Sequence, residues 1–343
     1  MKVSIVGGSG YTGIELIRIL LNHPKVEIDK IVSESNKGKK VSELFQNLKN
    51  IFEKEFIGVS NLEVELKDSE YIFLAVPHKA AMEYVPMLLK MGKKVIDLSA
   101  DFRIDDFEVY EQWYKENHVA KEYLEEAVYG LPELNREKIK KARLVANPGC
   151  YPTTVILGLA PLLSEKLIDI NTIISDSKSG VSGAGKKCTA TTHFSETNEN
   201  FKAYGIASHR HTPEIEQELS KLAKKDIIIS FTPHLIPMTR GMLSTIYSNL
   251  ISEQTEEEIV ELYKTFYKNE KFVRIVEVVQ TKNVRGSNFI DIAVKLDKRT
   301  NRIIVTSAID NITKGASGQA IQNFNIMAGF NEMEGLNLIG YLP

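Results

Sequence analysis

A glycine-rich turn between a short apolar run and an amphipathic stretch limits the fold more than any other feature. Lys2–Val6 is a strand candidate, and the turn that follows, Gly7–Gly13, has glycine at every third position. Apolar residues then recur at helical spacing over Ile14–Leu21, and Val26–Val32 is a second strand candidate. Strand, turn, helix and strand in this order predict a βαβ unit with a parallel strand pair.

The same turn has the chemistry of a phosphate-binding loop. Glycine lets bare backbone approach a pyrophosphate and lets the helix pack closely on its strand. The helix N-terminus adds free N–H groups and the positive end of its dipole. The pattern is weak alone and strong at the start of a βαβ unit. We therefore expect a dinucleotide to be bound by Gly7, Gly10, Tyr11, Thr12 and Gly13.

The rest of the N-terminal part alternates between strand and helix patterns. Tyr71–Val76 is an almost continuous apolar run, as expected of a central parallel strand. Lys79–Lys90 has helical periodicity, Gly92 is a typical helix stop, and Lys94–Leu98 is another strand candidate. These patterns predict an α/β protein with an N-terminal, Rossmann-like, doubly wound parallel sheet over residues 1–146.

The pattern changes near Arg143. The strand candidates beyond it are Asp169–Ser177, Ile227–Phe231, Met242–Leu250, Phe272–Val279, Phe289–Leu296 and Ile303–Ile309. Long helices are expected only near Thr212–Lys225 and Glu256–Lys268. An excess of strands predicts a second α+β domain with a mixed or antiparallel sheet over residues 147–313. The helical stretch in residues 314–343 is expected to return and complete the first domain.

Composition excludes several classes of protein. A net charge of −2 and a pI of about 6.4 argue against a nucleic-acid-binding surface. The longest apolar runs reach about half of the roughly 20 residues that a membrane span needs. The start of the chain leaves no room for a signal peptide, and two cysteines suit a reducing compartment, so a cytoplasmic location is expected. The histidines are scattered without metal-ligand spacing, so no metal site is expected.

The residues after the second strand bear on the choice of cofactor. Glu34 is a candidate for the acid that an NAD site places on the ribose. However, Ser33, Ser35 and Lys39 fit the 2′-phosphate of NADP better, although a lysine-rich run is often only a solvated loop. The sequence favours NADPH/NADP.

The segment Asn147–Thr153 places a thiol in a Pro/Gly turn ahead of an apolar helix. If Pro152 is the first helical residue, Cys150 lies just before the helix, where the dipole and free amides stabilise a thiolate. The alternative is that Cys150 is a small buried hydrophobe. Cys188, beside Lys186, is a weaker candidate because no helix start follows it. We expect Cys150 to be the nucleophile.

A nucleophilic thiol needs a base, and two histidines precede another helix start. Thr212 is a candidate N-cap and Pro213 a candidate first helical residue, so His211 would stand at the positive end of a helix. That field favours a neutral ring that accepts a proton. We expect His211 to be the acid/base and His209 to contact the substrate; a surface or capping role for both histidines is the alternative.

Further loops have the character of anion sites. Arg103 follows a parallel strand at its carboxyl end and suits a bidentate grip on phosphate or carboxylate. The glycine-rich segment Lys178–Lys186 combines a flexible backbone with hydroxyl and ammonium groups. Gly318 opens the late helix and is expected near the cofactor. The expected substrate contacts are Arg103, Asn147, Ser179, Ser182, Lys186 and His209.

Taken together, these segments resemble the N-acetyl-γ-glutamyl-phosphate reductases of arginine biosynthesis, in order along nearly the whole chain. The segments are Gly7–Gly13, Asp97–Arg103, Asn147–Thr153, Ser179–Lys186, His209–Pro213 and Lys314–Gln319. The resemblance implies a relationship to aspartate-semialdehyde dehydrogenases, Cys150 as nucleophile, His211 as acid/base, NADPH as reductant and a homo-oligomer, dimer or tetramer. Lys186 departs from the pattern, since arginine is expected there.

The reaction that the resemblance implies is reduction of an acyl phosphate to an aldehyde through a cysteine thioester. An aminoadipyl phosphate of lysine biosynthesis and aspartyl phosphate remain alternative substrates, because one methylene contributes only about 1–3 kcal/mol of discrimination. A regulator that senses NADP and has lost catalysis is the alternative from a different class.

Overall fold

The computed structural model describes residues 1–341, and the chain divides into two compact units. Unit 1 contains Met1–Pro148 and Ala316–Asn337, and unit 2 contains Gly149–Gly315 and the chain from Leu338. The sequence analysis placed all of residues 314–343 with the first domain; positions 342 and 343 lie outside the described residues. The chain from Leu338 belongs to unit 2 because of its packing there. The Tyr341 ring packs directly on Gly286, which has no side chain, and the Arg285 guanidinium lies 4.7 Å from the centre of that ring.

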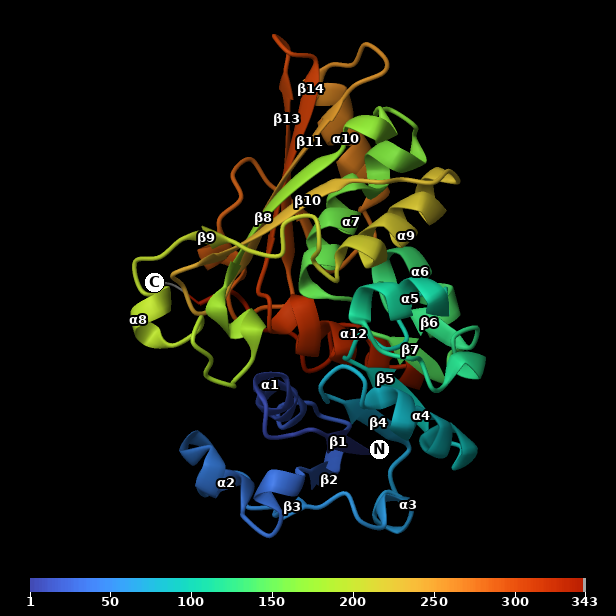
Figure 1. The fold of residues 1–343 in the computed structure, drawn as a ribbon, viewed down its shortest axis with the longest axis vertical. Coiled ribbons are helices and arrows are strands. Elements are labelled where there is room, and N and C mark those ends of the chain that lie inside the picture. Colours follow the sequence, from blue (N-terminus) through green and yellow to red (C-terminus); the bar gives the residue numbers. More distant parts are fainter. Residues whose placement is uncertain (342–343) are drawn as a thin grey trace. The chain divides into compact units, whose positions relative to one another are not determined.

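The sheet of unit 1 is entirely parallel, which confirms the predicted Rossmann-like class. Its seven strands have the order β3-β2-β1-β4-β5-β7-β6 (Figure 1). Every neighbouring pair in this order runs in the same direction. The strands are β1 (Lys2–Val6), β2 (Glu27–Val32), β3 (Phe56–Ile57), β4 (Tyr71–Leu74), β5 (Lys94–Asp97), β6 (Ala127–Tyr129) and β7 (Leu144–Ala146).

Helices cover both faces of this sheet. The helices α3, α4 and α5 bury their apolar sides in one core with the strands, including Leu62, Val85 and Tyr110. On the other face α12 contacts α1, α6 and β5. The helices of unit 1 are α1 (Tyr11–Leu20), α2 (Val41–Leu44), α3 (Leu62–Glu65), α4 (Ala81–Lys90), α5 (Phe107–Tyr114), α6 (Pro132–Ile139) and α12 (Gly318–Ala328).

Steric limits explain the glycines between β1 and α1. Gly7 has φ +91°, and a Cβ there would collide with the carbonyl oxygen of Ala75 at the end of β4. A Cβ on Gly13 would lie 2.6 Å from the Cα of Gly8. Glycine at these two positions lets the chain reverse and lets α1 start directly against the sheet.

The sheet of unit 2 is mixed, as predicted for the second domain. Its order is β12-β13-β14-β11-β8-β10-β9, in which β8 with β10 and β12 with β13 are parallel and the other pairs antiparallel. The strands are β8 (Ile174–Gly180), β9 (Lys202–Ala203), β10 (Ser230–Ile236), β11 (Met242–Asn249), β12 (Val273–Ile275), β13 (Ile290–Asp297) and β14 (Arg302–Ile309).

Two of these strands start later than the sequence suggested. The stretch before Ile174 forms a 3₁₀ turn, because the Asp169 side chain accepts a hydrogen bond from the backbone of Asn171. β10 starts at Ser230 and continues to Ile236. Local side-chain capping of this kind competes with strand pairing and is invisible to a search for apolar runs.

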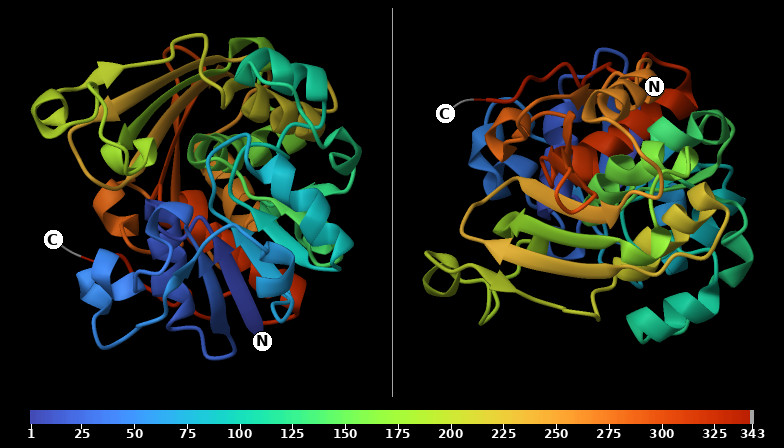
Figure 2. Two further views of the ribbon diagram at one scale, coloured as in Figure 1. Left: turned by 60° about the horizontal axis from the view of Figure 1, so that its bottom comes forward. Right: turned by 90° about the horizontal axis from the view of Figure 1, so that it is seen from above.

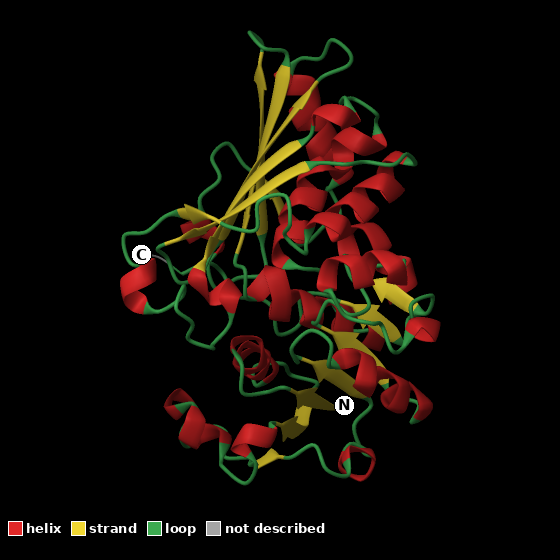
Figure 3. Cartoon of the chain, in the orientation of Figure 1, coloured by secondary structure: helices red, strands yellow, loops and turns green. Residues whose placement is uncertain are grey.

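The helices of unit 2 are α7 (Cys150–Ser164), α8 (Phe194–Thr197), α9 (Thr212–Ala223), α10 (Glu256–Phe266) and α11 (Thr281–Val284). Three of them, α7, α9 and α10, lie together on one side of the long strands (Figures 1, 2 and 3). α7 contacts β11 and β14, while α9 and α10 pack against α7. In α7 every residue from Tyr151 to Leu163 is buried, so this helix is the centre of the unit 2 core.

Pro161 lies inside α7 and removes one helical hydrogen bond, since it has no N–H to donate to the carbonyl oxygen of Leu157. Tyr267 donates its hydroxyl to that oxygen at 2.5 Å, and Tyr263 donates to the carbonyl oxygen of Gly158 at 2.5 Å. The carbonyl group that Pro161 leaves without a helical partner is therefore satisfied from outside the helix.

Gly13→Ala is expected to destabilise the protein by about 1–3 kcal/mol, since the added methyl meets backbone that has no rotamer to change. Gly10→Ala is the matched control, because a Cβ there has no neighbour nearer than 4.0 Å and the φ of Gly10 is −85°. Urea unfolding of both variants measures the difference. Equal loss of stability would contradict this steric explanation.

Candidate active site

The turn before α1 presents an open backbone surface. Gly10 is the N-cap of α1, and a Cβ added there would meet no atom nearer than 4.0 Å. The first-turn N–H groups of a helix have no partners within the helix. Tyr11, the first helical residue, is 41% exposed. A bare N-cap next to free N–H groups fits a bound pyrophosphate, because no side chain blocks its approach.

The loop after β2 contains the residues that bear on the choice between NAD and NADP. Glu34 accepts a hydrogen bond from the backbone of Val59 at 2.7 Å, so its carboxylate is engaged within the protein. Ser33 donates to Ser9 in the glycine turn at 2.9 Å, and Asn36 donates to both Ser33 and Ser35. The two serines thus lie together beside the glycine turn, and Lys39 is exposed nearby in the chain.

The start of α12 lies against the start of α1. The hydroxyl of Ser317 donates to the carbonyl oxygen of Thr12 at 2.9 Å, which brings the next residue, Gly318, close to the glycine turn. Asn147 was expected to contact substrate, but its side chain is fully buried. It donates to Ala316 at 3.1 Å and accepts from Asn323 at 3.0 Å. In this structure Asn147 fastens the chain before the thiol to the C-terminal helix.

Arg103 belongs to a tightly bonded loop at the carboxyl end of β5. It is 5% exposed and donates to the carbonyl oxygen of Leu98 at 2.8 Å. The neighbouring Asp101 accepts hydrogen bonds from the backbone of Lys79 and Ala81 and from the hydroxyl of Tyr110. One carboxyl group therefore fastens the loops that follow β4 and β5.

Asp97 adds a second carboxyl group to this loop. Burial, and then the charge of Asp101, raise the pKa of Asp97 to about 7. Ser99 donates to Asp97 through both its backbone N–H and its hydroxyl at 2.8 Å. Because its pKa is raised, Asp97 takes up a proton more readily than an ordinary aspartate, and this reduces the repulsion between the two buried acids.

In unit 2, α7 begins at Cys150 itself, not at Pro152. Gly149 is the N-cap, and the carbonyl oxygen of Gly149 accepts from both the backbone and the hydroxyl of Thr153. The sequence analysis took Pro152 as the first helical residue, since proline is common at that position. In the structure Tyr151 and Pro152 both lie inside the helix. Cys150 is a partly exposed thiol that forms no disulfide, and it lies in the first helical turn, where the helix dipole favours an anion.

The two predicted histidines lie beside this turn. The His211 ring is 5.9 Å from the Tyr151 ring, and the His209 ring is 5.6 Å from it. His211 is the N-cap of α9, one residue earlier than expected, since Thr212 is already helical. Tyr204 and Phe231 complete an aromatic enclosure around His209.

His209 is held in its neutral form. Its Nδ1 accepts the backbone N–H of His211 at 3.1 Å, so the other ring nitrogen carries the proton. Burial, followed by the charge of Arg210, lowers the pKa of His209 to about 4. A neutral imidazole keeps one N–H group that can donate to a substrate oxygen, which is the role expected of His209.

Glu214 is a residue of this site that the sequence analysis missed. It is fully buried in the first turn of α9 and accepts the backbone N–H of Gly149 at 2.8 Å. Tyr151 on one side of Cys150 contacts the histidine rings, and Gly149 on the other side is bonded to Glu214. The starts of α7 and α9 are thereby joined. An acid three residues after a histidine is the only trace of this in the sequence.

Ser179 and Ser182 follow the end of β8. Ser179 is buried, hydrogen-bonds to the Tyr151 side chain and donates to the carbonyl oxygen of Gly180 at 3.0 Å. Ser182 accepts from Asn311 at 3.0 Å. These contacts bring Ser179 next to the thiol turn. Lys186 lies farther along the same loop and is exposed.

Arg240 is a second cation near this loop that the sequence analysis did not single out. Its guanidinium donates to Asp310, which is fully buried, and to Thr313 at 2.8 Å. Asp310 also accepts backbone N–H groups from Gly286 and Ile312. This ion pair fixes the segment between β14 and Gly315, and a Cβ on Gly315 would lie 2.7 Å from the Cβ of Cys150.

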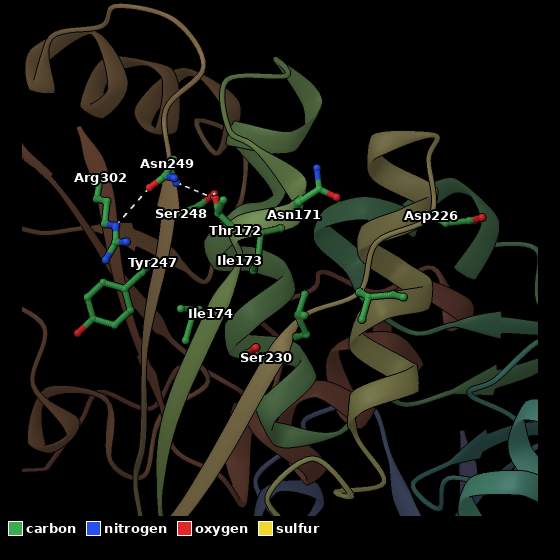
Figure 4. Close-up of a pocket in the computed structure, with 12 residues that line it drawn as sticks. Asn171, Thr172, Ile173, Ile174, Asp226, Ser230, Tyr247, Ser248, Asn249 and Arg302 are labelled. Carbon is green, nitrogen blue, oxygen red and sulfur yellow. Dashed lines mark hydrogen bonds between the residues drawn. The ribbon is translucent and has the colours of Figure 1, made fainter. Parts of the chain in front are cut away.

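Other features of the structure carry no comparable chemistry. Cys188 is exposed in the loop after β8. Among residues 1–341 no group of three or more His, Cys, Asp or Glu side chains is placed to hold a metal ion. No helix in the described part of the chain is long and apolar enough to cross a membrane. A hollow at the ends of β8 and β11 is lined by residues that include Tyr247 and Arg302, and neither a cysteine nor a histidine is among them (Figure 4).

Comparison with known proteins covers both units. A family model described as the NAD binding domain of semialdehyde dehydrogenase matches residues 2–142. A second, described as the semialdehyde dehydrogenase dimerisation domain, matches residues 150–311. Among solved structures, aspartate semialdehyde dehydrogenase II from Vibrio cholerae aligns over 96% of this chain and 98% of its own, with a TM-score of 0.73 and 17% identity. That likeness concerns the fold.

Curated relatives are much more similar in sequence. The N-acetyl-gamma-glutamyl-phosphate reductase of Geotalea daltonii is 55% identical, and the alignment covers 100% of both chains. The enzyme of the same name from Geobacter sulfurreducens is also 55% identical, with 100% of each chain covered. Identity at this level over the full length shows that the chain belongs to the N-acetyl-gamma-glutamyl-phosphate reductases, within the semialdehyde dehydrogenase family.

Proposed function

We propose that this protein reduces N-acetyl-L-glutamyl 5-phosphate to N-acetyl-L-glutamate 5-semialdehyde and phosphate, with NADPH as reductant, in arginine biosynthesis. The observation that supports it best is the thiol in the first turn of α7, with His211 and Glu214 bonded or packed against its two neighbours. Membership of the reductase family supports the substrate. A cytoplasmic location belongs to the same proposal, since both cysteines are free thiols.

The chain's own groups suit each chemical step. The Cys150 thiolate attacks the acyl carbon, the bond to the phosphate oxygen breaks, and phosphate leaves with that electron pair. Bound NADPH supplies the hydride that reduces the resulting thioester. His211 donates a proton to the departing phosphate or to the oxyanion that forms when hydride adds to the thioester. It then takes a proton from the resulting hydroxyl group as the C–S bond breaks, which releases the aldehyde and the thiolate.

The substrate contacts are part of the same proposal. Ser179 and His209 both lie near the Tyr151 side chain and offer a hydroxyl group and an N–H group. Ser182, Lys186 and Arg103 supply further donors for phosphate or carboxylate oxygens. Glu214 acts as a positioning residue, because its bond to Gly149 holds the N-cap of the thiol helix.

Wild-type protein with NADP, phosphate and N-acetyl-glutamate semialdehyde is expected to form NADPH, and only when phosphate is present. Cys150→Ser is expected to abolish this turnover, because the hydroxyl is a far weaker nucleophile at neutral pH, while NADPH still binds. Absorbance at the NADPH band and fluorescence titration measure the two effects. Wild-type-like rates in Cys150→Ser would overturn the mechanism.

The same assay is applied to a His211 variant and to two other semialdehydes. His211→Asn is expected to lower the turnover rate about 100-fold or more with unchanged thermal unfolding, as for loss of a general acid–base. Aspartate semialdehyde and aminoadipate semialdehyde are expected to react more slowly than N-acetyl-glutamate semialdehyde. A faster reaction with either would reassign the substrate, and no turnover with all three would favour a sensor role.

NADP specificity is proposed from the loop after β2. Lys39→Ala is expected to raise KM for NADPH about tenfold, the equivalent of one charge-assisted hydrogen bond, with KM for NADH unchanged. Lys40→Ala is the matched control, because Lys40 pairs with Glu53 at 3.7 Å and is engaged within the protein. An equal effect of both variants, or a lower KM for NADH than for NADPH in the wild type, would contradict the assignment.

We further propose that the chain forms a homodimer through the face of the unit 2 sheet opposite α7. Ile174, Tyr247 and Ile304 lie directly opposite one another on three adjacent strands and are partly or well exposed. The family model matched by residues 150–311 is described as a dimerisation domain. A two-fold interface would cover this apolar row with its own copy.

Ile174→Glu is expected to convert a dimer of 38.6 kDa chains into monomers, because it places a charge in the proposed interface. Val119→Glu is the control, since Val119 is an equally apolar, 65% exposed residue of unit 1. Sedimentation velocity distinguishes the species. A monomeric wild type, or a dimer that survives Ile174→Glu, would exclude this face.

A further inference from the structure

Three serines form a row across the unit 2 sheet beneath the first turn of α7. Ser177 on β8, Ser244 on β11 and Ser307 on β14 lie directly opposite one another in the strand register. All three are fully buried. Serine is a poor choice for the centre of a buried sheet, because a branched apolar side chain would pack more area and need no hydrogen bond.

The row meets one residue of the helix. The hydroxyl of Thr154 is 2.7 Å from that of Ser244, which is 2.7 Å from that of Ser177. Ser307 donates to the carbonyl oxygen of Thr154 at 3.0 Å. Thr154 is itself fully buried, so the side chain and the backbone of this one residue are both bonded to the sheet.

The direction of the hydrogen bonds follows from one proton per hydroxyl. Thr154 donates to the carbonyl oxygen of Tyr151 at 2.8 Å. Ser244 must then donate to Thr154, and Ser177 to Ser244. The chain of hydroxyls ends on the backbone of Tyr151, the residue that follows Cys150, and every member donates and accepts in turn.

The neighbours of α7 on these strands become mainly apolar one turn farther along. A Cβ on Gly158 would meet the side chains of Ile246 and Val305 first, and then the hydroxyl oxygen of Ser307 at 3.8 Å. Apolar neighbours under Thr154 would bury more apolar area and would need no hydrogen bonds. The directional hydrogen bonds to Thr154 instead fix how α7 is rotated about its axis next to the reactive turn.

We propose that Ser244, acting through Thr154, is a positioning residue that sets the orientation of the Cys150 turn for attack on the acyl carbon. This inference rests on the proposed function for its kinetic effect. Loss of the Ser244 hydroxyl removes the donor to Thr154 and frees α7 to rotate or shift at its N-terminus. A displacement of about 1 Å at a nucleophile can slow a reaction about 100-fold.

Ser244→Ala is expected to lower kcat at least about tenfold, with KM for NADPH unchanged. Thr154→Val, which keeps the shape but loses the hydroxyl, is expected to do the same, while Thr154→Ser restores most of the activity. The matched control is Ser248→Ala. Ser248 lies on the same strand, is 1% exposed and is bonded to Thr172 and Asp169, away from the thiol turn.

A second readout does not depend on turnover. In a Cys188→Ser background Cys150 is the only thiol of the chain, so its rate of alkylation against pH can be followed directly. Ser244→Ala and Thr154→Val are expected to shift that pH profile, and Ser248→Ala to leave it unchanged. The midpoint temperature of thermal unfolding is expected to fall by similar amounts in Ser244→Ala and Ser248→Ala.

The outcomes separate the two proposals. No turnover in the wild type, with the alkylation shift still present in Ser244→Ala, would reject the proposed reaction and keep the positioning role. Wild-type turnover with equal kcat and equal alkylation profiles in Ser244→Ala and Ser248→Ala would show that the serine row is only structural and would overturn the inference.

Discussion

The close seating of α7 on the unit 2 sheet is the contact on which the rest of this unit depends. The helix is apolar and buried on all sides, so nothing in its own sequence selects one rotation about its axis. The selection comes from small and polar groups at particular points. Gly158 allows close approach to Ile246, Thr154 bonds to the serine row, and Tyr267 occupies the carbonyl that Pro161 leaves free.

The reactive turn is constrained from the helix side as well as from the sheet side. Glu214 binds the backbone of Gly149, and the neutral His209 receives the backbone N–H of His211. Thiol and imidazole come from segments separated by 60 residues in the chain, and buried hydrogen bonds at the starts of two helices bring the segments together. Such bonds are costly to break in a low-dielectric interior, which makes the geometry rigid.

In unit 1 the proposed cofactor site depends on the glycine turn between β1 and α1. Gly7 and Gly13 are required by contacts with backbone, whereas Gly10 faces open space. The first two positions maintain the fold of the turn, and the third leaves the helix N-terminus accessible. Asp101 hydrogen-bonds the loops after β4 and β5 with one carboxyl group, and the raised pKa of the neighbouring buried Asp97 reduces the repulsion between the two acids.

The sequence by itself determined the fold class of both sheets, because hydrophobic periodicity and glycine spacing are local signals that β1, β5, β11 and α10 all display. It also marked Cys150 and His211, since each precedes a recognisable helix start. Only the tertiary structure decided where α7 begins, that Asn147 turns toward α12, and that Glu214 and Ser244 support the thiol turn. Those roles depend on which residues of distant segments meet, and a local pattern contains no information about a hydrogen bond formed across the core.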